Sequence, residues 1–208
     1  MKVIFKNSSL EFRRKHTKQI VYKDYWVRAE GQGVNLDSLG GVLDSVSFNN
    51  LKGILNAYYI DVQGNVEAIF QTRGSNSSVN IPWGKTLRYA PFSDGYAEFD
   101  AFTQSGAFEV SFDASTQSAT MDGVTKTATA TPSSSTIQFC GIYMAAHKTN
   151  VVAYTGKSKF GRLRLYKAND DTLLCDVRPA VVDGVPCLYD EVSDTEFYSV
   201  DGTALVLE

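Results

Sequence analysis

The sequence contains few of the residues that bind metals or form disulfide bonds. Its 208 residues include three cysteines and two histidines. Cys140, Cys175 and Cys187 lie far apart and form no C-x-x-C pair, so they predict neither a disulfide framework nor a zinc site. We expect all three to be reduced and to serve as small core residues.

The sequence also lacks a basic excess and any long hydrophobic run. Its 20 Lys and Arg against 23 Asp and Glu give a net charge of −3, which argues against nucleic acid binding. No stretch approaches the roughly 20 apolar residues of a membrane helix, and no apolar segment of a secretory signal follows Met1. We therefore expect a soluble protein that is made in the cytoplasm and does not insert into membranes.

Short segments in which apolar and polar residues alternate make up much of the chain. Residues 107–112 alternate strictly, as a half-buried β-strand does. Asp122-Gly123 lies between β-formers and predicts a type I′ hairpin, because both turn residues need positive φ. Many short strands with turn residues between them, without an internal repeat or a break in composition, predict a single all-β sandwich.

Three further segments carry local predictions. Residues 160–166 place two leucines on one side of a strand and Arg162, Arg164 and Tyr166 on the other. Residues 51–60 are the one place where a short helix is plausible. Pro179 is expected to end the strand that precedes it, because proline cannot donate to a β-ladder.

The last fifty residues contain three segments with a distinctive order of residues. They are Gly-Arg-Leu at 161–163, Leu-Leu-Cys-Asp-Val-Arg-Pro at 173–179, and Leu-Tyr-Asp with a following Phe-Tyr at 188–198. Together they resemble the C-terminal signature of concanavalin A-like (laminin G-like) jelly-roll domains in bacteriophage and prophage proteins. Cys175 stands where that family usually has arginine, and Cys187 where it has glycine.

This resemblance implies both a fold and a function. The fold is a single concanavalin A-like jelly roll of two antiparallel sheets, with a strand rather than a helix at residues 51–60. Phage proteins with such domains are usually capsid decoration proteins, head fibres or tail-associated adhesins. We therefore expect a non-enzymatic virion structural protein, made in the host cytoplasm, that forms a homo-oligomer and contacts other virion proteins.

Residues 1–25 are predicted to form an N-terminal strand or arm, and residues 26–208 the sandwich. The arm holds the one basic run of the chain, with Arg13, Arg14, Lys15 and Lys18. Such a run fits an attachment segment that docks onto an acidic surface of a partner protein. A solvated loop is the alternative interpretation.

A carbohydrate-binding adhesin for host glycans is the alternative function. Sugar sites combine aromatic faces with amide and carboxylate groups. The candidate sugar-binding residues are Trp83, Tyr89, Tyr96, Asn80 and Asp94. Polar groups that could instead hold calcium are Asn76, Asn80, Asp94 and Asp100, and no other cofactor is indicated. Trp83 also fits an aromatic cap over the core.

A β-glucan hydrolase is the third alternative, because some jelly rolls of this type are glucanases. Those enzymes have a strand pattern E-x-D-x-(x)-E, whose glutamates act as nucleophile and general acid. Glu98 and Asp100 match its first half, but Phe102 and Thr103 stand where the second glutamate would be. One carboxylate without a proton donor cannot perform both steps. Neither histidine belongs to a recognisable nucleophile motif, so we predict no enzymatic activity.

Overall fold

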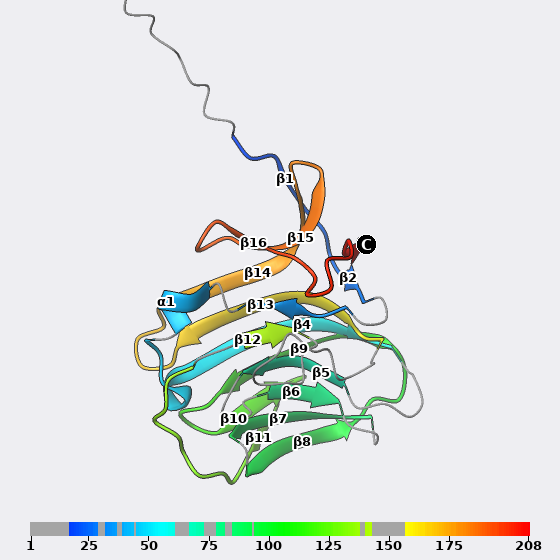
Figure 1. Cartoon of the computed structure of the whole chain (residues 1–208). Helices are drawn as coiled ribbons and strands as arrows, with labels where there is room; N and C mark the ends of the chain where they lie inside the picture. The colour runs from blue at the N-terminus through cyan, green and yellow to red at the C-terminus, as the bar shows by residue number, and fades with distance from the viewer. Residues whose placement is uncertain are drawn as a thin grey trace, which may run out of the picture.

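The computed structural model describes residues 17–28, 32–36, 39–43, 45–60, 67–72, 78–81, 85–92, 94–137, 140–142 and 157–208. Over these residues the protein is an all-β sandwich of two antiparallel sheets, which confirms the predicted fold class (Figure 1). Helical structure in this part of the chain is limited to one turn, α1 (Gly40–Leu43), and a 3-10 turn at Phe48–Asn50. No helix among these residues is long and apolar enough to cross a membrane.

The larger sheet contains eleven strands within the described ranges. Eight of them follow one another in the order β11-β10-β9-β4-β13-β14-β15-β16, while β1 pairs with β14, and β2 pairs with β13 and β17. Their bounds are β1 (Ile20–Tyr22), β2 (Trp26–Val27), β4 (Leu51–Tyr59), β9 (Gly106–Asp113), β10 (Ser118–Met121), β11 (Val124–Thr127), β13 (Lys159–Lys167), β14 (Leu173–Val182), β15 (Val185–Asp190), β16 (Thr195–Phe197) and β17 (Val206–Leu207).

The smaller sheet has the order β3-β12-β5-β6-β7-β8. Its strands are β3 (Val34–Asn35), β5 (Glu67–Thr72), β6 (Ser78–Ile81), β7 (Thr86–Phe92), β8 (Gly95–Ala101) and β12 (Cys140–Ile142). Aromatic side chains join the two layers. Phe112 of the larger sheet lies with its ring centroid 5.8 Å from that of Phe70 and 5.1 Å from that of Tyr89, both in the smaller sheet. The core therefore lies between the sheets.

Strand β4 settles the interpretation of residues 51–60. Leu51, Leu55 and Tyr59 are buried in the core, whereas Lys52 and Asn56 between them are half-buried on the other side. This period of two is that of a strand, and β4 is hydrogen-bonded on both sides, to β9 and β13. The helical interpretation was wrong, and the strand that the resemblance implied is confirmed.

The hairpin at Asp122-Gly123 is confirmed. The two residues have φ values of 52° and 76° and connect β10 to β11, with Thr120 paired to Thr125 across the hairpin. Positive φ at both positions is the geometry that matches the twist of the flanking strands. A local pattern alone was sufficient here.

The prediction that Pro179 ends its strand was wrong. Strand β14 continues through Pro179 to Val182, and Pro179 pairs with Leu188 of β15. The carbonyl of Pro179 accepts a hydrogen bond from the backbone N–H of Lys23, 2.9 Å away. The backbone nitrogen and carbonyl of one strand residue point to the same side, so the missing N–H faces the β1 side. The β14–β15 ladder therefore loses no hydrogen bond.

The sequence signature corresponds to a hydrogen-bonded network that joins β13, β14 and β15. Arg162 donates from Nε to Oδ1 of Asp176 over 2.7 Å, and the backbone N–H of Asp176 donates to Oδ1 of Asp190 over 2.6 Å. Asp190 is fully buried and also accepts the backbone N–H of Ser193 over 2.9 Å. Buried carboxylates need such partners, so these signature residues have structural roles.

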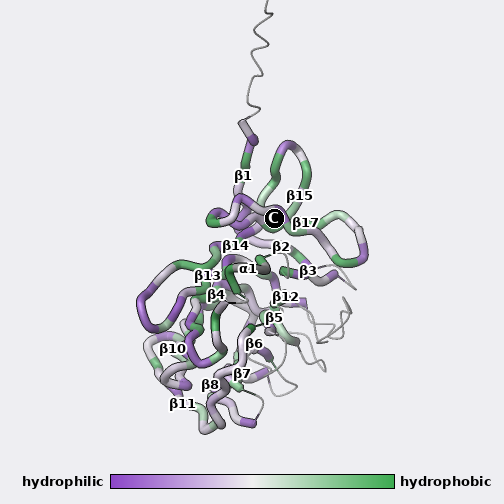
Figure 2. The backbone as a smooth tube through the Cα atoms, turned by 60° about the vertical axis from the view of Figure 1, so that its left-hand side comes forward, coloured by the Kyte–Doolittle hydropathy of each residue, from purple (hydrophilic) through white to green (hydrophobic). Residues whose placement is uncertain are grey.

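Strands β1 and β15 project beyond the rest of the sandwich in both views (Figures 1 and 2). Both strands pair with the end of β14. This part of the sheet contains a second, small hydrophobic cluster, against which Ile20 packs and which consists of Ala180, Val182, Cys187 and Tyr189. Part of the predicted arm, Ile20–Tyr22, is thus a strand of the larger sheet. The domain boundary at residue 25 stays a prediction.

The three cysteines are free and buried, as predicted. Burial raises the pKa of the Cys187 thiol to about 11 and that of Cys175 well above its ordinary value. Since the thiolate is the reactive form, these groups are inert near neutral pH. They contribute to packing, as small apolar side chains do.

Candidate functional site

The register of the larger sheet arranges alternate side chains in rows on its outer face, which we call the large-sheet face. The central row crosses five strands and consists of Thr120, Ser111, Ile54, Arg164 and Asp176. The row on one side consists of Ser118, Asp113, Lys52 and Tyr166, and the row on the other side of Glu109, Asn56 and Arg162. Neighbouring strands lie about 4.8 Å apart, and residues two apart along a strand about 7 Å. The rows therefore form one continuous, mainly polar surface.

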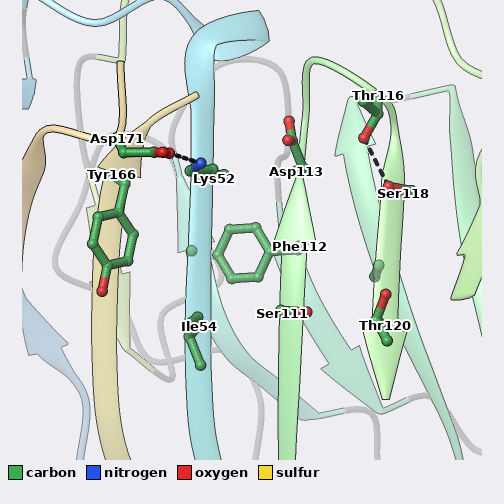
Figure 3. A pocket seen from close by; sticks show the side chains of 12 residues that line it. Lys52, Ile54, Ser111, Phe112, Asp113, Thr116, Ser118, Thr120, Tyr166 and Asp171 are labelled. Atoms are coloured by element: carbon green, nitrogen blue, oxygen red, sulfur yellow. Dashed lines mark hydrogen bonds and ion pairs between the residues drawn. The ribbon is translucent and has the colours of Figure 1, made fainter. Parts of the chain in front are cut away.

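A first hollow of about 410 Å³ opens on this face (Figure 3). Its lining combines two aromatic residues, Tyr166 and the buried Phe112, with the hydroxyls of Ser111, Ser118 and Thr120. The apolar side chain of Ile54 lies among them. A ring, an apolar contact and several hydroxyls in one hollow are the groups that hold a small polar ligand in a fixed orientation.

The charged groups of the first hollow neutralise each other in part. Lys52 forms an ion pair with Asp171, and this hydrogen bond raises the pKa of the lysine. Asp113 accepts hydrogen bonds from the backbone and hydroxyl of Ser115, at 2.8 and 2.6 Å. The hydroxyls of Thr116 and Ser118 lie 2.7 Å apart. These contacts position the polar side chains without enclosing them.

A second hollow of about 390 Å³ opens further along the same face. It is lined by Tyr25 and Asn56 together with three cations, Lys23, Arg162 and Arg178, and one carboxylate, Asp24. Tyr25 packs edge-on against Tyr58, with ring centroids 5.8 Å apart. The hollow thus carries an aromatic ring, an amide and a local excess of positive charge.

The two hollows adjoin each other on β4. Ile54 lines the first and Asn56 the second, two residues along the same side of the strand. Arg164 pairs with Ile54 across the strands and Arg162 pairs with Asn56, so Arg164 lies at the junction. The two hollows share no lining residue, so they offer two neighbouring sites that suit successive units of an extended ligand.

Arg164 differs from the other cations of the face. Its Nε is closed off from solvent and has no hydrogen-bond partner among the described residues. Asp176, opposite Arg164 across β13 and β14, holds Arg162 instead through both carboxylate oxygens. An unsatisfied buried donor is uncommon in folded proteins and marks a place where a partner is missing.

Of the sugar-binding residues predicted from the sequence, those that the structure describes do not lie on the large-sheet face. Trp83 lies outside the described residues, as does Asn76. Tyr89 is fully buried in the core, with its ring against Phe112, and is out of reach of an external ligand. Asn80 and Tyr96 belong to β6 and β8 of the smaller sheet.

The surroundings of Tyr96 and Asp94 show how they are engaged. The Arg88 guanidinium lies over the Tyr96 ring, 4.2 Å from its centroid, and also forms an ion pair with Glu98. Asp94 lies in the turn between β7 and β8 and accepts the backbone N–H of Thr131 at 3.0 Å. Hydrogen bonds from Thr131 hold the pKa of Asp94 below its ordinary value. Asn80 donates to the hydroxyl of Ser78 over 3.0 Å.

Glu98 and Asp100, the partial glucanase pattern, are exposed on β8. Glu98 accepts a hydrogen bond from the hydroxyl of Thr86 at 3.2 Å besides its ion pair with Arg88. These contacts give Glu98 a structural role, as one member of an ion pair on the surface of the smaller sheet. Catalytic inactivity stays a prediction.

Of the predicted attachment residues, Lys18 alone is described, since Arg13, Arg14 and Lys15 lie outside the described residues. The Lys18 ammonium forms ion pairs with Asp194 at 2.8 Å and Glu196 at 3.1 Å. Hydrogen bonds to these carboxylates raise its pKa. Lys18 therefore holds its segment against β16 and the turn before it, and attachment to a partner stays a prediction.

Over the described residues, no group of three or more His, Cys, Asp or Glu side chains is placed to hold a metal ion. Two of the residues considered for calcium, Asn80 and Asp94, are engaged by Ser78 and Thr131 as described above.

The residues of the large-sheet face were missed as a site because they come from distant parts of the sequence. Lys52 and Tyr166 are neighbours across β4 and β13, although more than a hundred residues separate them. One signal was present. The alternation in residues 160–166 placed Arg162, Arg164 and Tyr166 on one side, and this side is the outer one.

The fold and site define an antiparallel β-sandwich with a hollowed polar sheet face. No protein-family model matches the chain, and no curated protein matches it in sequence. Among solved structures, the chain is similar to the CBM40 module of the Ruminococcus gnavus IT-sialidase bound to α2,6 sialyllactose. The identity is 10%, the match covers 74% of this chain and 96% of that one, and the TM-score is 0.49.

The same module bound to α2,3 sialyllactose gives 11% identity, the same coverage of 74% and 96%, and a TM-score of 0.47. At these levels of identity and superposition, the likeness carries no argument about the ligand of this chain.

Proposed function

We propose that this protein is a non-enzymatic, glycan-binding β-sandwich whose ligand lies along the large-sheet face. The observation that carries this proposal is the pair of adjoining hollows on one face, of about 410 and 390 Å³. Volumes of this order suit small organic ligands, for which pockets span about 300–1,000 Å³.

The chemistry of the lining supports a saccharide. A sugar offers an apolar ring face and many hydroxyls, and each hollow provides one tyrosine, Tyr166 or Tyr25, beside hydroxyl, amide and charged groups. Tyrosine combines an apolar ring with a hydrogen-bonding hydroxyl and so serves both parts of a sugar. Two such hollows in succession suit consecutive units of an oligosaccharide.

The proposal is tested on a glycan array, followed by calorimetry with the best ligand. We expect Tyr166→Ala to weaken binding by about tenfold or more, since loss of a buried aromatic contact costs on the order of 1.5–3 kcal/mol. Tyr96→Ala is the matched control on the other sheet and is expected to change the affinity by less than about twofold.

The result also discriminates between the two candidate surfaces. If Tyr96→Ala or Trp83→Ala abolished binding while Tyr166→Ala left it intact, the ligand would lie near residues 76–100, as the sequence suggested. If wild-type protein gave no signal with any glycan, the proposal would be refuted. Thermal unfolding of each variant checks that the fold is retained.

Display on a phage virion remains a second proposal, supported by the resemblance of residues 161–198 to phage jelly-roll domains. A glycan-binding sandwich and a virion component are compatible roles, as in an adhesin. Mass spectrometry of purified particles tests this role, and absence of the protein from particles would refute it. Incubation of wild type and Glu98→Gln with β-glucans tests the predicted lack of hydrolysis. Hydrolysis by wild type that disappears in Glu98→Gln would overturn this prediction.

A further inference from the structure

We infer that the ligand of the large-sheet face is an anionic saccharide, whose acidic group lies in the second hollow while a neighbouring unit lies in the first. This inference rests on the proposed function and names its ligand class. It is carried by the distribution of cations on the face, which differs sharply between the two hollows.

The second hollow concentrates positive charge. Lys23, Arg162 and Arg178 line it against the single carboxylate of Asp24. Arg162 is held by Asp176, and Arg178 lies 3.4 Å from Glu191, so both cations are partly neutralised by acids outside the lining. Lys23 has an exposed side chain and no ion pair among the described residues. It is free to meet a ligand.

The two arginines of the second hollow are fixed in position. Arg162 is bound through both carboxylate oxygens of Asp176, and the Arg178 guanidinium lies 3.5 Å from the centroid of the Tyr22 ring. A guanidinium held in this way loses little conformational freedom when it binds an anion. The hollow is therefore preorganised for a charged group.

Arg164 adds a further cation at the junction of the hollows. It forms no ion pair within the described residues, and its Nε has no partner. Its neighbours across the strands are the uncharged Ile54 on β4 and Asp176 on β14, and Asp176 holds Arg162. Its neighbours along β13 are Arg162 and Tyr166. A ligand carboxylate or sulfate beside the half-buried side chain of Arg164 would add to the counter-charge of Asp176, which Arg164 shares with Arg162.

The nearby acids cancel only part of this charge. Asp176 and Glu191 pair with Arg162 and Arg178, and neither Lys23 nor Arg164 has an ion pair among the described residues. Glu109, one row away, accepts a hydrogen bond from the Asn56 amide at 2.7 Å. Asp171 is paired with Lys52 in the first hollow. Asp24 is the one acid in the lining of the second hollow, and it stands against Lys23, Arg162 and Arg178, with Arg164 adjoining them.

The experiment compares three tetrasaccharides of equal length by calorimetry: a neutral galactose tetramer, a galacturonate tetramer and a sulfated galactose tetramer. We expect at least one anionic tetramer to bind about tenfold or more tightly than the neutral one, the effect of one or two charge-assisted hydrogen bonds. The preference is expected to shrink as salt is raised to about 1 M, where charges are screened within about 3 Å. Comparison of the galacturonate tetramer with the sulfated tetramer shows whether the protein prefers a carboxylate or a sulfate.

The test variant is the double substitution Lys23→Gln and Arg164→Gln, which leaves the ion pairs of Arg162 and Arg178 intact. We expect it to lower the ratio of anionic to neutral affinity by about tenfold, which removes most of the anionic preference. Lys126→Gln on β11 is the matched control, since Lys126 pairs with Ala119 and lies on the opposite side of the strand from Thr125.

The outcomes separate this inference from the proposed function. Equal binding of all three tetramers that is lost in Tyr166→Ala would overturn the anionic ligand and keep glycan binding. An anionic preference unchanged in the double variant would overturn the role of Lys23 and Arg164. Absence of binding to the tetramers and to the whole array would refute both.

Discussion

The outer faces of the two sheets use their charged residues in different ways. On the smaller sheet, Arg88 forms an ion pair with Glu98 and lies over the ring of Tyr96. These charged and aromatic groups therefore contact one another within the face. On the large-sheet face, two hollows leave rings and hydroxyls open, and Arg164 has no carboxylate of its own. Similar residue types thus produce a closed surface on one sheet and an open one on the other.

This contrast shows why composition alone does not identify a site. Aromatic, amide and carboxylate residues are frequent between positions 76 and 100. Of those that the structure describes, Tyr89 lies in the core, Asn80 and Tyr96 lie on the smaller sheet, and Asp94 lies in a turn. Unsatisfied buried atoms occur on both sheets, at Gln71 Oε1 of β5 and at Arg164 Nε of β13. What distinguishes the large-sheet face is that Arg164 lies between two hollows. Unsatisfied groups beside a hollow indicate ligand binding more strongly than residue type does.

The largest effect is expected from filling the space beneath the first hollow. A Cβ at Gly53 would lie 2.5 Å from Cζ of Phe112 and 2.9 Å from the backbone oxygen of Arg164. The Phe112 ring is held by Phe70 and Tyr89 and cannot move away. Gly53→Val should therefore lower the free energy of unfolding by about 3 kcal/mol or more, as measured in urea.

Gly106→Val provides the matched control in the same sheet. A Cβ at Gly106 would meet nothing within 4 Å, and the residue is half-buried in β9. The control should change stability by less than about 1 kcal/mol. Equal stability of the two variants would show that Phe112 and the backbone of Arg164 do not pack closely against Gly53 beneath the first hollow.

Much of the fold was predictable because its determinants are local. Alternation with a period of two identified β9 and β13, and Asp122-Gly123 fixed a hairpin through backbone conformation alone. The course of β14 through Pro179 was not predictable in this way. It depends on which side the proline nitrogen faces, and that is decided by the pairing with β1 and β15.

The site was less predictable than the fold. Its central row contains residues from five strands, and the order in which strands pair cannot be read from the alternation of any one of them. The alternation of β13 correctly placed Arg164 and Tyr166 on one side, but Lys52 and Ser111 join them only through the pairing of β4 with β13 and β9. Tyr89 was a candidate sugar-binding residue, whereas the alternation of β7 points its side chain inward.

A smaller effect is expected from removing one carboxylate from each face. Asp176 is buried and holds Arg162 through both oxygens, so Asp176→Asn should cost about 1–3 kcal/mol of stability, measured in urea. Glu98 is exposed, and Glu98→Gln should cost less than about 1 kcal/mol.

The same pair of variants should differ in ligand binding. Asp176→Asn removes the counter-charge of Arg162 in the second hollow, so the affinity for an anionic saccharide should rise even though the protein is less stable. Glu98→Gln should leave that affinity unchanged. A fall in affinity in Asp176→Asn would mean that the position of Arg162 matters more than its free charge.

The smallest effect concerns pH and compares the pair Asp194 and Glu196 beside β16 with Asp94 in the turn between β7 and β8. Hydrogen bonds from Lys18 and Tyr189 lower the pKa of Asp194, and hydrogen bonds from Tyr198 and Lys18 lower that of Glu196. Thr131 lowers the pKa of Asp94 on the smaller sheet. A folded-state pKa below the unfolded value stabilises the protein above pH about 4. That stability is lost as the pH falls through the folded-state pKa.

Thermal unfolding of wild type and Lys18→Gln between about pH 6 and pH 2 checks this dependence. The variant should have the lower Tm at pH 6 and should converge with wild type at the acidic end, because protonation of Asp194 and Glu196 removes what Lys18 contributes. Lys126→Gln should follow wild type throughout. Parallel curves for Lys18→Gln and wild type would show that Lys18 does not hold β1 to the rest of the large sheet, and its role as a free attachment residue would gain support.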